Sequence, residues 1–319
     1  MKKILPLLSL FLVAIFLWSN CFSQQSQKKV LRTIVIDPGH GGIDQGADGS
    51  FSTEAQVSLA VSRKLGKAIE QEFPDSKIVY TRTTDVLPGN KSNKTDALRY
   101  RADLANSSGG DLFIAIHCNS APPIRHSEIT GYKTVTSYKG KGKKKKKVTK
   151  KVPQYHYWTT PNPAEGTETY IWALSKNDAK VNSVSKIEED YGEVDSTSNI
   201  TLPDPSDPAE KARMLIYAQN YFRKSLTFAD LIEKGFQSQG RTYRGGVKQR
   251  NDKGIWVLQA TGMPSVLVEI GFMSNKDEEN YINSEKGQDE IVANIVNAIK
   301  DYKQKRESRQ ITSDDKKAF

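Results

Sequence analysis

The chain has 319 residues, and a content of 37% hydrophobic and 26% charged residues suits a folded globular protein and excludes a largely disordered one. Its formal net charge of +10 is local, because without Lys2, Lys3 and the nine lysines between Lys139 and Lys151 the charge is −1. A basic run without a recognised binding fold or interleaved aromatic residues argues against a nucleic-acid-binding protein.

The first 23 residues have the layout of a secretory signal peptide. Two lysines precede an apolar run from Ile4 to Trp18, and Ser23 offers a small residue for cleavage. The run is shorter than the ~20 apolar residues of a membrane span, so we expect export and no transmembrane span in the mature chain. Residues 24–29 then form a linker. A lipidated Cys21 is the alternative.

Strand and helix patterns alternate over the next part of the chain. Short runs rich in β-branched residues predict strands, and a capping box, Thr53-Glu54-Ala55-Gln56, predicts the start of a helix. This alternation is typical of an α/β fold, a mostly parallel twisted sheet flanked by helices on both faces. The expected strands are Val30–Asp37, Lys77–Arg82 and Leu112–Ile116, and the expected helices begin at Glu54 and span Thr95–Ala105.

Residues from about 120 to 237 interrupt this alternation, and we expect a partly helical insertion packed over one edge of the sheet. Within it, Lys139–Lys151 is expected to be a solvated loop, because blocks of like charge repel one another. Such a loop could also attract anionic wall polymers or lipid surfaces. The other expected segments are an aromatic stretch at Tyr155–Trp158, a strand at Glu168–Leu174, and helices at Lys176–Asp190 and Asp207–Phe236.

The core pattern returns near the C-terminus. Apolar runs predict strands at Ile255–Leu258 and Ser265–Ile270, and helical spacing predicts an amphipathic terminal helix from Ile282. We expect one domain over residues 30–304, a flexible tail over 305–319, and a monomer.

Four side chains of the types that a zinc hydrolase needs fall at one predicted edge of the sheet. His40 and His117 follow the ends of predicted parallel strands, where α/β sheets bind ligands. Glu54 lies in the first turn of a helix, so its carboxylate can reach the same edge and complete a His-Glu-His zinc site. Glu269 lies in an otherwise apolar strand. An isolated buried carboxylate is costly, so a neighbouring metal site and a role as general base would explain it.

Each of these residues also has a structural interpretation. His40 could cap a helix, His117 could be a satisfied histidine at a strand end, and Glu54 could serve only the helix dipole. Their convergence on one edge favours the metal site. The residues expected at the surface or turned away from the site are His126, His156 and Cys118.

Three segments around these residues occur in the order of a known family's motifs. They are Ile34–Gly42, Asp111–Asn119 and Met263–Asn275, supported by Tyr243–Gln249 and Trp256–Leu258. In these segments the sequence resembles the zinc-dependent N-acetylmuramoyl-L-alanine amidases that separate daughter cells, over roughly Val30 to Tyr302. It departs from them at Ala55-Gln56, where the family usually has acidic or lysine residues.

The resemblance implies one zinc ion per chain bound by His40, Glu54 and His117, with Glu269 as the catalytic residue. It implies peptidoglycan as the substrate and the periplasm as the location. The helical part of the insertion resembles the regulated branch of the family, in which an inhibitory helix covers the zinc until a protein activator displaces it. The candidates for the blocking residue are Glu188, Glu189 and Glu210. The remaining alternatives are a zinc peptidase that cuts the stem peptide and a wall-binding module without activity.

Overall fold

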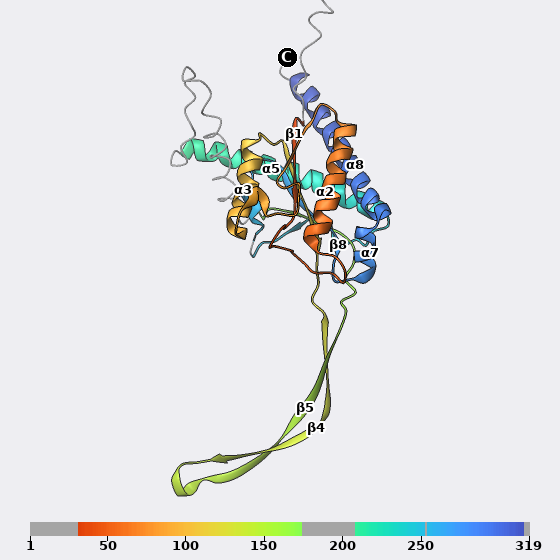
Figure 1. Cartoon of the computed structure of the whole chain (residues 1–319). Coiled ribbons are helices and arrows are strands. Elements are labelled where there is room, and N and C mark those ends of the chain that lie inside the picture. The colour runs from red at the N-terminus through yellow and green to blue at the C-terminus, as the bar shows by residue number, and fades with distance from the viewer. Residues whose placement is uncertain (1–30, 174–207, 253, 316–319) are drawn as a thin grey trace, which may run out of the picture. The chain divides into compact units, whose positions relative to one another are not determined.

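The computed structural model of the chain describes residues 31–173, 208–252 and 254–315 (Figure 1). The expected signal peptide, the linker and the expected helix Lys176–Asp190 lie outside these residues. Within the described part of the chain, no helix combines the length and apolar character that a membrane span requires.

A six-stranded sheet forms the centre of the fold, in the order β2-β1-β3-β8-β6-β7. The first four strands pair in parallel, which confirms the predicted mostly parallel sheet. Strand β6 runs antiparallel to β8, and β7 pairs in parallel with β6. The strands are β1 (Thr33–Pro38), β2 (Lys77–Tyr80), β3 (Leu112–Asn119), β6 (Glu168–Ile171), β7 (Lys248–Gln249) and β8 (Ser265–Phe272).

Helices cover both faces of the sheet. Helix α2 packs on β1 and β3, and α8 packs on α2 and α5 (Figure 1). On the other face, Val35 and Phe113 lie in one core with Ala105 of α3 and Leu258 of α6. The helices are α2 (Glu54–Glu72), α3 (Lys94–Ser107), α5 (Pro208–Ser238), α6 (Trp256–Ala260), α7 (Lys276–Asn283) and α8 (Glu285–Asp315), with short 3₁₀ turns at η1 (Pro88–Asn90) and η2 (Gly142–Lys144).

The start of helix α2 agrees with the capping box seen in the sequence. The backbone N–H of Thr53 donates to the side chain of Gln56 at 3.2 Å. The backbone N–H of Glu54 donates to the carbonyl of Ala47 at 2.9 Å, which ties the helix start to the preceding loop. The first turn of the helix, and with it Glu54, is therefore held in a defined position.

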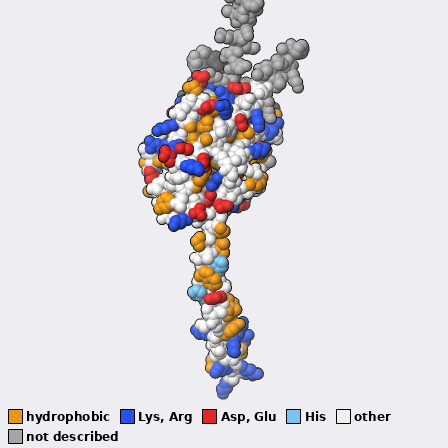
Figure 2. Space-filling model, turned by 90° about the vertical axis from the view of Figure 1, so that its right-hand side faces the viewer, with side chains coloured by type: hydrophobic (Ala, Val, Ile, Leu, Met, Phe, Trp, Pro, Cys, Tyr) orange, Lys and Arg blue, Asp and Glu red, His pale blue; other side chains and the backbone are white. Residues whose placement is uncertain are grey.

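The lysine run is not a loop, contrary to the sequence prediction. It occupies the end of β4, the turn and the first residues of β5 in a two-stranded antiparallel ribbon. The two strands are β4 (Ile124–Lys139) and β5 (Lys146–Thr160). Its lysine side chains are exposed and gather at one end of the ribbon (Figure 2). Water and salt screen the repulsion between exposed lysines. The β propensity of branched residues such as Val135 and Val148 therefore outweighs this repulsion and favours strands.

Two further expectations near the C-terminus differ from the structure. The segment Ile255–Leu258 is not a strand, because Trp256–Ala260 forms the short helix α6. A run of four apolar residues suits either element, so its pattern could not decide between them. Helix α8 continues to Asp315, where we expected a flexible tail from residue 305.

A buried carboxylate of α7, Glu279, anchors the loop that leads into α2. The backbone N–H groups of Ser50, Phe51 and Ser52 donate to it at 2.7–2.9 Å, and the hydroxyls of Ser50 and Ser52 also donate. Burial alone would raise the pKa of Glu279, but these hydrogen bonds lower it to about 2.

This arrangement predicts a pH-dependent contribution to stability. The pKa of Glu279 is lower in the folded chain than its ordinary value of 4.5, so its contribution is complete above pH 4.5 and is lost as the pH falls towards 2. We expect Glu279→Gln to lower the free energy of unfolding by about 2 kcal/mol at pH 7, and the difference from wild type to shrink below pH 4.5. Thermal unfolding at several pH values measures it. The exposed neighbour Asp277→Asn is the control, and an equal effect of both variants would contradict the prediction.

Candidate metal centre and active site

The loop after β1 holds His40 in an unusual backbone conformation. Its φ of 58° lies in the left-handed region, which is uncommon for a residue other than glycine. Two buried arginines fix this loop. Arg101 donates to the carbonyl of His40 at 2.7 Å, and Arg82 donates to the carbonyl of Gly39 at 2.6 Å. A Cβ atom at Gly39 would lie 2.6 Å from the His117 ring, so the close approach of the loop to β3 requires glycine here.

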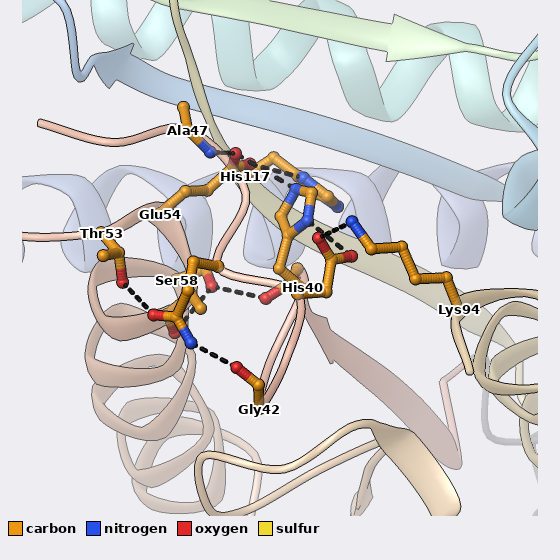
Figure 3. A network of polar contacts seen from close by, with 12 residues as sticks. His40, Gly42, Ala47, Thr53, Glu54, Ser58, Lys94 and His117 are labelled. Carbon is orange, nitrogen blue, oxygen red and sulfur yellow. Dashed lines mark hydrogen bonds and ion pairs between the residues drawn. The ribbon is translucent and has the colours of Figure 1, made fainter. Parts of the chain in front are cut away.

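His40, Glu54 and His117 meet at the carboxyl end of the parallel strands (Figure 3). The Glu54 carboxylate lies between the two imidazoles, with Oε2 at 3.1 Å from His40 Nε2 and Oε1 at 2.7 Å from His117 Nδ1. One ligand atom from each residue lies within 4.8 Å of the other two. The structure therefore brings together the three residues that the sequence singled out as ligands.

Neighbouring groups orient these donors. Asp44 Oδ2 lies 3.0 Å from His40 Nδ1, and Lys94 holds Asp44 at 2.6 Å (Figure 3). The Asp44 carboxylate beside Nδ1 orients the His40 ring so that Nε2 faces the cluster. In metal sites, a carboxylate beside the non-coordinating nitrogen of a histidine ligand has the same effect. Ala47 and Cys118 donate backbone N–H groups to Glu54 at 2.9 and 3.0 Å.

The charges in the cluster are strongly coupled. Burial alone would raise the pKa of Glu54, but hydrogen bonds from His117 and His40 hold it well below its usual range. Burial would lower the pKa of His40, but the hydrogen bond and charge of Glu54, together with Asp44, raise it. Glu54 is thus an ionised carboxylate, the form in which it can bind a cation.

Two imidazoles and one carboxylate fit a zinc ion. This donor set is one of those found in catalytic zinc sites, where three protein ligands leave a fourth position for water or substrate. The donor atoms lie close enough together for one cation to contact all three. The residues present therefore fit the metal that the sequence suggested.

Glu269 lies on β8, directly opposite His117 in the register of the sheet. Its Oε2 is buried, and no hydrogen-bond partner for it occurs among the described residues. The guanidinium of Arg250 lies 3.9 Å from Oε1. Burial, the largest influence, raises the pKa of Glu269 to about 7, although His117 and Arg250 act in the opposite direction. The side chain can therefore exchange a proton near neutral pH.

A second buried carboxylate, Glu168 on β6, was not identified from the sequence. It lies opposite Glu269 across the β6–β8 pair. Burial would raise its pKa, but the hydrogen bonds that it accepts lower it to about 2. Glu168 is thus ionised at neutral pH and both of its oxygens accept hydrogen bonds, whereas no hydrogen-bond partner of Glu269 Oε2 occurs among the described residues. Its hydrogen-bond donors are Arg244 (2.7 Å), Lys248 (2.6 Å), Asn119 (2.9 Å) and Tyr170 (2.7 Å).

A cavity of about 410 Å³ joins the cluster to Glu269. Arg250 and the half-exposed Trp256 also line it, and neither was singled out from the sequence. Trp256 begins the motif-like segment Trp256–Leu258 and Arg250 follows the segment Tyr243–Gln249, but these segments gave no individual roles. The cavity has the volume of a small-molecule site.

Of the remaining candidates, Cys118 borders the cavity, and the others lie on the ribbon, in α5 or outside the described residues. His126 and His156 lie on the ribbon, where both stack against Trp158. The Cys118 thiol is buried, and burial raises its pKa well above the usual range. Glu188 and Glu189 lie outside the described residues. Glu210 belongs to α5, but its side chain is not described.

The mostly parallel sheet, the His-Glu-His cluster at its carboxyl edge and the adjacent buried Glu269 define an α/β protein with a candidate metal-dependent hydrolytic centre. The profile of a family described as N-acetylmuramoyl-L-alanine amidase matches residues 34–301. The chain therefore belongs to the N-acetylmuramoyl-L-alanine amidase family, an enzyme family.

Individual relatives agree with this assignment. The N-acetylmuramoyl-L-alanine amidase AmiC of Escherichia coli is 26% identical over 84% of this chain, but the chain spans only 52% of its length. The germination-specific N-acetylmuramoyl-L-alanine amidase of Bacillus subtilis is 24% identical, with 95% of this chain and 96% of that protein covered. The crystal structure of Ami1 from Mycobacterium smegmatis shares the fold, with a TM-score of 0.50, 16% identity, and coverage of 87% and 100%.

The contacts of Arg101 predict that it positions the site, because its buried side chain donates to the carbonyl of His40. It also donates to the carbonyl of Pro38 and pairs with Asp37 in the buried interior. We expect Arg101→Met to lower kcat/KM by about ten- to a hundredfold, because a displacement of His40 by a fraction of an ångström would disturb the reacting geometry. It should also destabilise the fold by about 3 kcal/mol, since it leaves Asp37 unpaired.

Rates should be measured at a temperature where the variant is folded, with circular dichroism as the check. The exposed Arg99→Met, in the same helix, is the control. Unchanged kinetics in a folded Arg101→Met would show that the arginine does not position His40.

Proposed function

We propose that this protein is a zinc-dependent amidase that hydrolyses the bond between the lactyl group of N-acetylmuramic acid and L-alanine in peptidoglycan. The observation that carries the proposal is the cavity that joins His40, Glu54 and His117 to Glu269, whose Oε2 has no hydrogen-bond partner among the described residues. Membership of the amidase family supports the choice of the scissile bond.

In this proposal His40, Glu54 and His117 hold one zinc ion per chain. Zinc, when bound, polarises the substrate carbonyl and makes water more acidic. The ionised form of Glu54 and the Asp44 contact to His40 prepare the donors for a cation. The buried arginines keep His40 in place while the substrate binds.

Glu269 acts as the general base and then as the general acid. Its carboxylate takes a proton from the attacking water and returns it to the departing α-amino group of L-alanine. A pKa of about 7 suits both steps, because the group accepts and releases a proton with similar ease near neutral pH. Glu168 is less suited to this role, because its oxygens are occupied by four donors.

Digestion of purified muropeptides, followed by mass spectrometry, tests the reaction. We expect glycan products with a free lactyl carboxyl group and peptides with a free N-terminal L-alanine. Cleavage inside the stem peptide would instead indicate a zinc peptidase, and the absence of any product would indicate a wall-binding module. Metal analysis of the same sample should find one zinc per chain.

We further propose export to the periplasm, with cleavage after Ser23, and a role in daughter-cell separation. The layout of residues 1–23 supports export, and the relationship to amidases supports a place of action at the wall. Mass spectrometry of the mature protein should find Gln24 as the first residue. A lipid-modified Cys21 would contradict cleavage at Ser23. Deletion of the gene should produce chains of unseparated cells.

The helical insertion is proposed to restrain the enzyme until a protein activator displaces it. Support comes from the long helix α5, which lies within the insertion and packs on β6 and α8. Deletion of residues 188–211 should raise hydrolysis of muropeptides in the absence of any activator. If the rate does not rise in a folded variant, the insertion is not inhibitory.

A further inference from the structure

The ribbon of β4 and β5 carries almost all of the net charge of the protein. Fifteen residue pairs hold its two strands together. Between Ile124 and Thr160 it has eleven lysine and arginine residues and one carboxylate, Glu128, so its formal charge of +10 equals that of the whole chain. No ribbon lysine forms an ion pair within the described part of the chain, and all of them are exposed. Its charge is therefore available to an external partner.

Basic side chains occur on both faces of the ribbon. Directly paired residues share a face, and successive residues along a strand alternate between faces. Lys139 pairs with Lys146 on one face, and Tyr138 pairs with Lys147 on the other. The lysines of the first face are Lys133, Lys139, Lys146 and Lys150, those of the second are Lys147 and Lys151, and Lys141 and Lys143–Lys145 form the turn.

Aromatic side chains occur along the ribbon, with Tyr132 and Tyr138 among the lysines and a cluster in the half away from the turn. Trp158 stacks on His126, with ring centroids 5.3 Å apart and an interplanar angle of 16°, and on His156 at 5.7 Å and 21°. Tyr155 lies next to Tyr157, with ring centroids 5.8 Å apart. Tyr157 is 71% exposed and Trp158 is 40% exposed. These rings offer flat surfaces with an apolar face and a polar edge, which suit the C–H faces of sugar rings.

We propose that the ribbon is a second binding surface for peptidoglycan, the anionic glycan-peptide polymer on which the proposed function rests. Lysine ammonium groups pair with carboxylates of the stem peptides, and the aromatic rings pack on the sugars. The residues of the ribbon do not line the catalytic cavity, so this surface binds the wall independently of the scissile bond. The ribbon thereby keeps the enzyme on an insoluble substrate between cleavage events.

The distribution of charge favours a polymer network over an anionic membrane. A flat bilayer can contact only one face or the turn, which leaves many of the lysines unused. The turn, residues 140–145, contains only glycine and lysine, so it offers no apolar side chain for insertion into lipid. The strands of a polymer mesh can reach both faces and the aromatic half at the same time.

Sedimentation with purified peptidoglycan sacculi tests the proposal. All binding measurements use the full-length mature chain with Glu269→Gln, so that the sacculi are not digested. The ribbon variant replaces the five residues Lys143–Lys147 with serine. The matched control replaces five exposed lysines outside the ribbon, namely Lys67, Lys77, Lys91, Lys276 and Lys286.

We expect the ribbon variant to bind sacculi at least tenfold more weakly, while the control binds like the parent. Binding by the parent should fall steeply as salt is raised, because the contacts are exposed charges. Some binding of sacculi by the parent should remain at high salt, because aromatic contacts are not screened. A second variant, Tyr155→Ala with Tyr157→Ala, should weaken this remaining binding. Circular dichroism verifies that each variant is folded.

The same ribbon substitutions in a chain with intact Glu269 should leave hydrolysis of a small soluble muropeptide unchanged. This arm separates the two proposals, since the absence of muropeptide hydrolysis by the wild-type chain would count against the amidase and not against the ribbon. Equal binding of sacculi by parent and ribbon variant would overturn the inference. Tighter, ribbon-dependent binding to phosphatidylglycerol vesicles than to sacculi would overturn it as well, in favour of a membrane contact.

Discussion

Glu269→Gln should lower kcat for muropeptide hydrolysis by at least about a thousandfold, because the amide cannot accept the proton of the attacking water. The substitution keeps the size and shape of the side chain. It also removes a buried carboxyl group whose Oε2 lacks a hydrogen-bond partner among the described residues. We therefore expect the variant to fold at least as well as wild type, and to retain its metal. Initial rates and metal content, measured on one preparation, distinguish loss of the base from loss of the ion.

The control for this variant is a glutamate of similar character outside the cavity. Glu233 on α5 is buried, accepts a hydrogen bond from Thr169 at 2.6 Å, and has a pKa that burial raises. Glu233→Gln should leave kcat within about twofold of wild type, since nothing in the proposed chemistry involves it. If Glu269→Gln retains wild-type activity, Glu269 is not the base.

His117→Ala should abolish both metal binding and activity. It removes one of three donors and leaves Glu54 with a single imidazole partner, which is too few ligands for a tight zinc site. Wild-type protein should contain one zinc per chain and should lose thermal stability when a chelator removes it. The variant should contain no zinc, and the chelator should not change its thermal stability. Elemental analysis and thermal unfolding with and without chelator measure these effects.

His156→Ala provides the comparison, because this exposed histidine of the ribbon lies outside the cluster. It should keep its zinc and its activity. Stoichiometric zinc in His117→Ala would mean that the ion is held elsewhere, and the proposed ligand set would then be incorrect.

The position of the site could be predicted from the sequence because its residues follow regular local signals. The buried run Ile34–Ile36 leads directly into His40, and the capping box places Glu54 in the first turn of its helix. Parallel strands end at the same edge, so a histidine after each of two such strands brings both to one place. The structure agrees with this part of the prediction.

The partners of Glu269 could not be predicted in the same way. Glu168 faces it only because β6 enters the sheet antiparallel to β8, and no local pattern in the sequence specifies that pairing. The ribbon was missed because a charge run was given more weight than the β-branched residues beside it. The first contact joins segments that are distant in sequence, whereas the ribbon is a local hairpin whose β-branched residues were the available signal.

The buried anchorage of the His40 loop has a consequence for how tightly the proposed zinc site can bind. Arg82 and Arg101 donate to carbonyl groups on the approach to His40 and hold a residue with a left-handed backbone in place. These hydrogen bonds belong to the fold, so the entropy of ordering the loop is lost when the chain folds and does not weaken the binding of a cation.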